Sequence, residues 1–282
     1  MAAGSERDFQ FTTKDFERVR SLARQHTGIA LSDAKQEMVY SRLGRRLRQL
    51  GIDTFSDYLD LVERQGFEGE LTEFTNAITT NLTSFFRENH HFEYLAQTML
   101  PELMRLRASE RHIRIWCSAS STGEEPYSIA MVVKEVMPKN SGWDIKILAT
   151  DLDTNVLATA ERGIYQESRI NGISAERKKR FFLRGKNKQV GFVRVVPELR
   201  QMITFRKLNL MDKQWPMRGP LDIIFCRNVM IYFTKETQKT IVERFSELLA
   251  DDGYLVMGHS ETLYKVSDRF ELIGKTMYRP SR

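Results

Sequence analysis

Three short stretches combine polar, charged and aromatic residues in patterns that could carry chemistry. They are residues 81–87 (Asn-Leu-Thr-Ser-Phe-Phe-Arg), 120–127 (Ser-Ser-Thr-Gly-Glu-Glu-Pro-Tyr) and 226–232 (Cys-Arg-Asn-Val-Met-Ile-Tyr). The second has the composition of a strand-to-helix loop, because its small residues let a ligand approach the backbone and Gly123 permits a tight turn. Together the three stretches predict a ligand site made from loops.

The charge of the second stretch restricts what it can bind. It carries two carboxylates, Glu124 and Glu125, and it lacks the Gly-x-Gly-x-x-Gly pattern of dinucleotide sites. A diphosphate would be repelled there, whereas a ligand that bears an ammonium and a sulfonium group would be attracted. This argues against a nicotinamide-dependent dehydrogenase.

Further polar residues follow the other expected strands. Asp151 stands where an acid usually binds ribose hydroxyls, while Asp153 is better suited to cap the next helix. Asn209 and Leu210, which follow the next strand, are suited to contact an adenine. Arg227 and Asn228, which follow the strand after that, stand where the reactive end of a methyl donor would lie. A cationic ligand, acids for a ribose and no phosphate site together predict S-adenosylmethionine as the cofactor. Taken singly, each acid is more often a helix cap or a surface residue; their joint occurrence at successive strand ends favours the ligand site.

The elements that must position these loops alternate between strand and helix. The expected strands are residues 112–118, 144–150, 221–226 and 253–258, and the expected helices are residues 126–137, 154–162 and 235–249. Such alternation predicts a parallel sheet with helices on both faces, in which ligands bind beyond the carboxyl ends of the strands. Residues 270–278 are expected to form a final strand at an edge.

The segments before and inside this domain have other patterns. Residues 13 to about 80 predict four helices, with Thr13 and Ser32 as caps for the first two and Gly28 and Gly51 as their ends. A fifth helix, kinked at Pro101, would follow. Residues 190–196 and 202–207 are expected to pair antiparallel in an inserted subdomain. The predicted fold is α/β, with a helical domain at 1–80, a methyltransferase domain at 81–282 and a β-subdomain at about 164–207.

Composition limits the remaining possibilities. The chain has 282 residues, enough for one large domain or two smaller ones with their own cores, and its net charge is +6. Cys117 and Cys226 fall in apolar strands and are expected to be buried free thiols. His90 and His91 have no third ligand at metal-site spacing, so no metal is expected. No apolar run is long enough to span a membrane and residues 1–7 are polar, which favours a soluble cytoplasmic protein.

Positive charge is concentrated in two places. Arg42, Arg45 and Arg46 share a helix face, and seven basic residues crowd residues 177–188. Basic faces bind nucleic acid, membranes or acidic protein surfaces, or are simply solvated.

The motifs, once assembled, closely resemble those of the bacterial chemotaxis receptor methyltransferases, the CheR family. The resemblance is carried by residues 81–87, 121–130, 225–233 and 258–261 (Gly-His-Ser-Glu), and it extends from about residue 14 to 279. It implies a helical domain followed by a Rossmann-like class I methyltransferase domain with a β-subdomain. It also implies methyl transfer from S-adenosylmethionine, with S-adenosylhomocysteine as product, to glutamate side chains on the cytoplasmic domain of chemoreceptors.

The resemblance assigns roles to individual residues. The implied cofactor contacts are Asn81, Thr83, Arg87, Glu125, Asp151, Asn209, Leu210 and Asn228, to which Arg227 is added as the neighbour of Asn228. Arg87 and Tyr232 would stand beside the transferred methyl group. Arg42, Arg45 and Arg46 become candidates for docking the acidic receptor, and the β-subdomain could bind a peptide at the receptor's C-terminus.

The expected catalysis is alignment, because the substrate carboxylate is itself the nucleophile and needs no catalytic base at neutral pH. Two rival functions stay open at this point. A nucleic-acid methyltransferase would use the basic residues 177–188, although Cys-Arg-Asn-Val replaces the Asn-Pro-Pro-Tyr type of sequence expected for methylation of base amino groups. A non-catalytic cofactor sensor or adaptor would need neither Arg87 nor Tyr232.

Overall fold

The computed structural model describes residues 8–64, 68–138 and 141–281. The reading of residues 1–7 as a polar start lies outside this part. The chain forms two compact units, one of residues 1–80 with 232–234 and one of residues 81–231 with 235–282. Neither unit contains, in the part described, a helix both long and apolar enough to cross a membrane.

The first unit is a bundle of helices around its own core. Its helices are α1 Thr13–Thr27, α2 Gln36–Leu50, α3 Phe55–Glu63 and α4 Glu68–Ile78, with a short 3₁₀ turn η1 at Asp33–Lys35. Val19, Leu43, Tyr58 and Phe74 are fully buried between them. Apolar residues at helical spacing thus build the bundle, as the sequence predicts.

The ends of α1 and α2 confirm the two expected glycine C-caps but neither of the two expected N-caps. Gly28 and Gly51 end α1 and α2 in the left-handed conformation, with φ of 73° and 66°. The cap of α1, however, is Thr12 rather than Thr13, and it forms a reciprocal capping box with Asp15. Ser32 was also wrongly predicted, because it precedes the 3₁₀ turn and makes no side-chain cap bond.

The second unit is built on a seven-stranded sheet. Its strands, in the order they occupy across the sheet, are β6 Ile203–Lys207, β2 Asp144–Asp151, β1 His112–Cys117, β7 Leu221–Cys226, β8 Leu249–Met257, β10 Met277–Pro280 and β9 Phe270–Gly274. The five strands from β6 to β8 are parallel. The order reverses between β1 and β7. Ligands of such sheets bind at this switch point, beyond the carboxyl ends of the strands.

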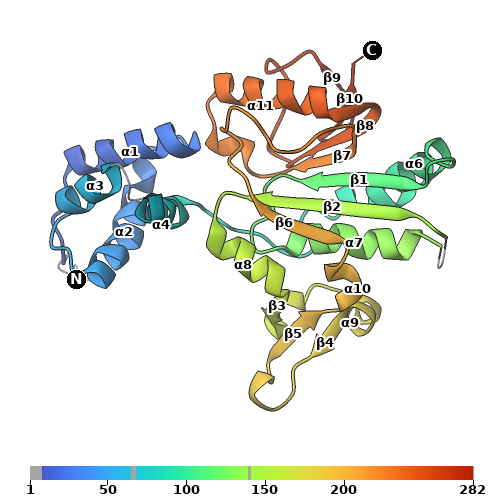
Figure 1. The fold of residues 1–282 in the computed structure, drawn as a ribbon, viewed down its shortest axis with the longest axis horizontal. Coiled ribbons are helices and arrows are strands. Elements are labelled where there is room, and N and C mark those ends of the chain that lie inside the picture. The colour runs from blue at the N-terminus through green and yellow to red at the C-terminus, as the bar shows by residue number, and fades with distance from the viewer. Residues whose placement is uncertain (1–7, 65–67, 139–140, 282) are drawn as a thin grey trace, which may run out of the picture. The chain divides into compact units, whose positions relative to one another are not determined.

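Helices cover both faces of this sheet (Figure 1). The helices are α5 His90–Tyr94, α6 Leu100–Leu106, α7 Glu124–Val136, α8 Thr154–Arg162 and α11 Lys235–Leu248. The buried side chains of β1 alternate: Ile115 and Cys117 join the core under α7, while Trp116 packs edge-to-face on Phe245 of α11. Strand and helix periodicities therefore agree on which side each residue faces.

The helix expected after residue 87 is interrupted earlier than predicted. A π-helical turn, η2 Leu95–Met99, separates α5 from α6, and Pro101 lies in the first turn of α6. Helical residues nevertheless run without a break from His90 to Leu106, so the missing N–H of Pro101 takes a donor from the carbonyl four residues earlier, within η2. The irregularity thus lies in the turn before Pro101, where a proline disturbs a helix.

A second, three-stranded sheet is inserted after α8. It consists of β3 Ile164–Gln166, β5 Phe192–Val195 and β4 Phe182–Arg184, paired antiparallel in that order, with α9 Ala175–Phe181, α10 Pro197–Arg200 and the 3₁₀ turns η3 Glu167–Ile170 and η4 Asn187–Gln189. The predicted pairing of residues 190–196 with 202–207 is wrong. β5 belongs to the small sheet, whereas β6 returns to the main sheet and pairs parallel with β2.

The last residues form a hairpin instead of one strand. β9 and β10 pair antiparallel, and β10 pairs antiparallel with β8, so β9 is the edge. Lys275 and Thr276 make the turn, which the prediction of a single strand over residues 270–278 missed.

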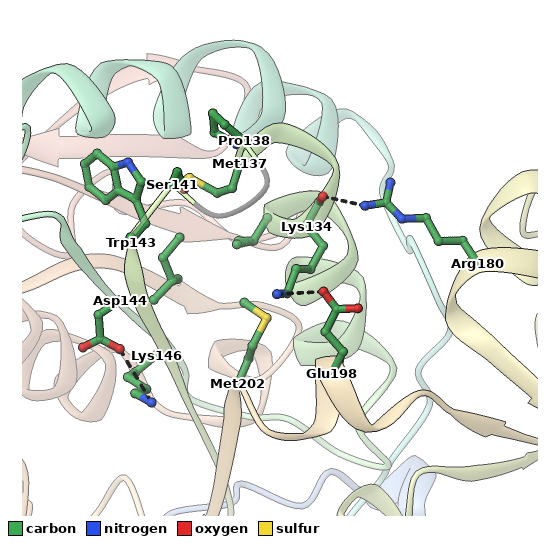
Figure 2. A pocket seen from close by; sticks show the side chains of 13 residues that line it. Lys134, Met137, Pro138, Ser141, Trp143, Asp144, Lys146, Arg180, Glu198 and Met202 are labelled. Atoms are coloured by element: carbon green, nitrogen blue, oxygen red, sulfur yellow. Dashed lines mark hydrogen bonds and ion pairs between the residues drawn. The ribbon is translucent and has the colours of Figure 1, made fainter.

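A cavity of about 600 Å³ lies at the opposite end of β2 from Asp151 (Figure 2). Trp143, Met137 and Met202 line it, and an ion pair between Lys134 and Glu198, with Nζ and Oε1 2.8 Å apart, crosses its wall. It opens at the amino ends of the parallel strands. Ligands of such sheets bind at the other edge, so the carboxyl edge is where the functional site is sought.

Candidate active site

The loops at the carboxyl edge hold strained backbone. Phe86, Glu88, Ser121 and Asn228 all have φ between 47° and 57°, although none is glycine. They are half of the eight non-glycine residues with positive φ in the described ranges. Side chains rarely adopt this conformation, and it persists where surrounding contacts enforce it, commonly at functional sites.

Arg227 supplies many of these contacts. It follows β7 and its side chain is 1% exposed. One guanidinium nitrogen donates to Oε2 of Glu125 at the start of α7, and the other donates to the carbonyl of Arg87 at 2.5 Å and lies 3.2 Å from Oε2 of Glu88. Burial alone would lower the pKa of Arg227, but the two carboxylates raise it, so the residue stays charged.

Glu88 holds three chain segments together. Its carboxylate accepts from the backbone N–H of His259 at 3.0 Å, from the imidazole of His259 at 2.7 Å and from the amide of Asn228 at 3.2 Å. Burial raises the pKa of this carboxyl, yet the bonds from His259 and the charge of Arg227 outweigh it and bring the pKa to about 2. Glu88 is thus ionised throughout the neutral range.

Glu261 fixes the backbone around Asn228. One carboxylate oxygen accepts from the N–H groups of Gly258 and Asn228 at 2.7 and 2.8 Å, and the other accepts from Met230 at 2.8 Å. A Cβ on Gly258 would come within 2.6 Å of the Asn228 amide nitrogen, so the close approach requires glycine. Burial raises the pKa of Glu261 in spite of these bonds.

Asp151 ends β2 and anchors the loop after β1. Its two carboxylate oxygens accept from the N–H groups of Ser121 at 2.7 Å and Asp153 at 3.0 Å. An ionised carboxylate has about four lone-pair sites, so capacity remains for ligand hydroxyls. Burial raises the pKa of Asp151 to about 6, since those backbone bonds compensate only in part.

The segment of residues 81–87 is bound to the same loops. The Asn81 amide donates to Oδ2 of Asp153 at 2.7 Å, and its carbonyl accepts from Ser121. Asp153 also caps α8, as the sequence predicts. The carbonyl of Thr83 accepts from Arg169 at 2.9 Å.

Arg87 differs from Arg227 in being partly accessible. Its guanidinium donates to the Leu82 carbonyl at 2.7 Å, and 31% of its side chain is exposed. The structure therefore gathers Arg87, Glu125, Arg227 and Asn228 in one network, in which Arg87 offers donors to the outside.

Asn209 and Leu210 follow β6, one strand beyond Asp151. The N–H of Leu208 donates to the Asp151 carbonyl at 3.0 Å, which ties the two loops together. Leu210 is buried, and the Asn209 side chain accepts from the N–H of Met211 at 3.0 Å. Their contact with an adenine stays a prediction.

The remaining candidates lie in the first unit. The carbonyl of Tyr232 accepts from Ala30 at 2.8 Å, and this residue is grouped with the helical unit, so its role beside Arg87 stays a prediction. Arg42 donates to the carbonyls of Ala77, in the last turn of α4, and of Thr79, just after that helix.

The other two docking candidates differ from each other. Arg46 forms a two-pronged ion pair with Glu70, with N–O distances of 2.9 and 2.6 Å. Arg45 is exposed. Of the three arginines, Arg45 therefore has the side chain most available to a partner.

Sequence reasoning assigned no role to Glu88, Glu261 or Arg169. Glu261 stands in the quoted motif Gly-His-Ser-Glu, and Glu88 directly follows Arg87, so both were adjacent to recognised residues. Only the fold brings residues 88, 228 and 259 together, because they follow different elements.

The donor set fits S-adenosylmethionine. Asp151 has acceptor capacity for ribose hydroxyls, and the loop after β1 offers no phosphate-binding charge. Ser120 in that loop has a buried hydroxyl for which the described residues provide no hydrogen-bond partner. No group of three or more His, Cys, Asp or Glu side chains in the described ranges is arranged to hold a metal ion.

Two models of one protein family match consecutive parts of the chain. Residues 14–79 match the family model described as CheR methyltransferase, all-alpha domain, and residues 81–279 match CheR methyltransferase, SAM binding domain. The chain is 46% identical over 276 residues to chemotaxis protein methyltransferase 2 of Pseudomonas aeruginosa, covering 97% of this chain and 95% of that one. It is also 46% identical to the chemotaxis protein methyltransferase of Escherichia coli, covering 95% and 91%.

These matches run through both compact units and include every motif from residue 81 to 261. The chain has the S-adenosylmethionine-dependent methyltransferase fold preceded by an all-α domain. It belongs to the CheR methyltransferase family.

Proposed function

We propose that this chain transfers a methyl group from S-adenosylmethionine to glutamate side chains of chemoreceptors and forms glutamate methyl esters. One observation carries the proposal. A partly exposed arginine, Arg87, stands at the carboxyl edge of a sheet whose loops fit S-adenosylmethionine, in a chain of the CheR family. The enzyme would act in the cytoplasm, on the cytoplasmic domain of methyl-accepting receptors.

The chain's residues would bind and orient rather than transfer protons. S-adenosylmethionine supplies, when bound, a methyl group activated by a sulfonium leaving group. Arg87 can bind the substrate carboxylate through paired N–H donors, and Asp151 can accept from ribose hydroxyls. A glutamate is already ionised at neutral pH, so no base is needed. Both thiols near the site, Cys117 and Cys226, are buried with raised pKa, which leaves them unsuited as nucleophiles.

Two surfaces would bind the receptor. Arg45, exposed on α2, would contact the acidic receptor helices. The small sheet would bind a peptide from the receptor's C-terminus. It exposes apolar side chains, Leu183 by 52% and Phe192 by 40%, and its edge strand β4 could pair with an extended peptide.

The rival function, methylation of a nucleic acid, has less support. Part of the basic cluster in residues 177–188 is engaged within the protein: Arg177 forms a two-pronged bond with Glu135 at 2.8 Å, and Arg180 donates to the Lys134 carbonyl at 2.8 Å. Methylation of receptors leaves a testable difference in the product, because glutamate esters hydrolyse in mild base and N-methyl groups do not.

The protein, incubated with radiolabelled S-adenosylmethionine and membranes that contain chemoreceptors, is expected to label the receptor band. Mild base should release that label as methanol. Label that resists base would contradict ester formation, and labelling of added RNA or DNA instead of receptor would favour the rival.

Replacing Arg87 by alanine removes the donors that would hold the substrate carboxylate. A misplaced reactant costs on the order of 100-fold in rate, so kcat for receptor methylation should fall by about that factor while the melting temperature stays unchanged. Arg105→Ala, on the exposed side of α6, is the control and should keep wild-type activity. Full activity in Arg87→Ala would show that this side chain does not position the substrate.

Cofactor affinity should depend on pH through Asp151. The carboxylate is lost as the pH falls through about 6, the value to which burial raises the pKa of Asp151. The Kd for S-adenosylhomocysteine, measured by calorimetry, should therefore rise roughly tenfold between pH 7.5 and pH 5. Asp151→Asn should bind weakly and without this dependence. Asp144→Asn, at the other end of β2, should behave as wild type, and a pH-independent wild-type Kd would refute the assignment.

Reversal of charge at Arg45 tests docking without disturbing the bundle. Arg45→Glu should lower kcat/KM for receptor about tenfold at low salt, less at high salt, and leave S-adenosylhomocysteine binding unchanged. Arg46→Glu is less informative, because it would place a carboxylate against Glu70. Lys14→Glu, exposed on α1, is the matched control; an equal effect there would mean that only net charge matters.

A further inference from the structure

We propose that Glu88 positions Arg87 and Asn228 for methyl transfer. Its carboxylate connects its own segment to the loops that follow β7 and β8. The inference rests on the proposed function. It assigns a role to a side chain that neither the motif comparison nor the cofactor contacts require.

Glu88 has two contacts on its own segment, with Oε1 4.0 Å from Nε of Arg87 and Oε2 3.5 Å from Nδ1 of His91. Its other contacts come from two distant parts of the chain. Residues 227 and 228 follow β7, and residue 259 follows β8. Asn228 donates to Oε1 of Glu88 at 3.2 Å, the His259 N–H donates to Oε2 at 3.0 Å, and Arg227 lies 3.2 Å from Oε2. Both oxygens are thus shared between separate loops, which a single local hydrogen bond could not achieve.

Glu88 acts on Arg87 through Arg227. The guanidinium nitrogen of Arg227 that faces Glu88 also donates to the Arg87 carbonyl at 2.5 Å. This contact holds the backbone from which the Arg87 side chain projects. The neighbouring positive φ values of Phe86 and Glu88, 54° and 57°, indicate that the backbone there would relax without such restraint.

Glu88 acts on Asn228 directly. The Asn228 backbone also has a positive φ, 57°, and Glu261 holds its N–H. The Glu88 bond is what orients the amide side chain. With Glu88 removed, Glu261 would still hold the backbone, so a loss of function would report side-chain orientation rather than collapse of the loop.

The negative charge is essential to this role. A glutamine in its place would keep one acceptor oxygen but present an NH₂ group to Arg227 or His259, which offer donors. Aspartate would keep the charge but shorten the reach by one methylene. Glu88→Gln should therefore impair positioning fully, and Glu88→Asp only in part.

The test compares Glu88→Gln, Glu88→Asp and the control Glu102→Gln by kcat and KM for receptor methylation, Kd for S-adenosylhomocysteine and melting temperature. Glu102 accepts from Tyr254 and Arg279, so the control also removes a partly buried ion pair, outside the site loops. We expect Glu88→Gln to lower kcat at least about tenfold and to raise the Kd, Glu88→Asp to be intermediate, and Glu102→Gln to keep wild-type kcat and Kd.

Wild-type kcat and Kd in Glu88→Gln would overturn the proposal. So would losses of activity and of binding in Glu88→Gln and Glu102→Gln that are explained by a smaller fraction of folded protein in each variant. Failure of the proposed function would be seen separately. Wild-type protein would then leave receptors unlabelled, and the Kd comparison, which needs no receptor, would still decide whether Glu88 positions Asn228.

Discussion

A guanidinium removed from water must be paired, and the pairing of Arg227 is the constraint on which the loops of this enzyme depend. Leaving such a charge unpaired typically costs about 3–5 kcal/mol. Here the partners come from two segments: Glu125 at the start of α7, and the neighbours Glu88 and Arg87, the latter through its carbonyl. Burying one charge therefore fixes the relative positions of residues that carry the chemistry.

The sheet explains why the constraint acts where it does. Parallel strands β2, β1 and β7 direct their carboxyl ends to one edge, and the order reverses between β1 and β7. The loops that follow these strands meet there with carboxylates and amides and with strained backbone at Ser121 and Asn228. The opposite edge has a cavity of about 600 Å³, lined by Trp143 and two methionines. Lys134 pairs with Glu198 and Lys146 with Asp144 in its wall, and its lining includes none of the family's motif residues.

Much of this organisation could be predicted from residue patterns, for identifiable reasons. Apolar runs located the strands. Polar residues after each one, such as Asp151, located the site, because strand ends in a parallel sheet share an edge. The assignment of β6 to the small subdomain failed, since a short strand shows its own periodicity but not its partner. Glu88 was missed for a related reason. The residues that bond to it follow other strands, and no spacing along the chain reveals contacts that only the packed loops create.

The most direct test of the account is a crystal structure of the protein with S-adenosylhomocysteine. The account predicts the ligand at the carboxyl ends of β1, β2 and β7, with its ribose hydroxyls on Asp151 and with Arg227 still paired to Glu125 and Glu88. A ligand in the cavity beside Trp143, or one that displaces Arg227 from these carboxylates, would contradict it.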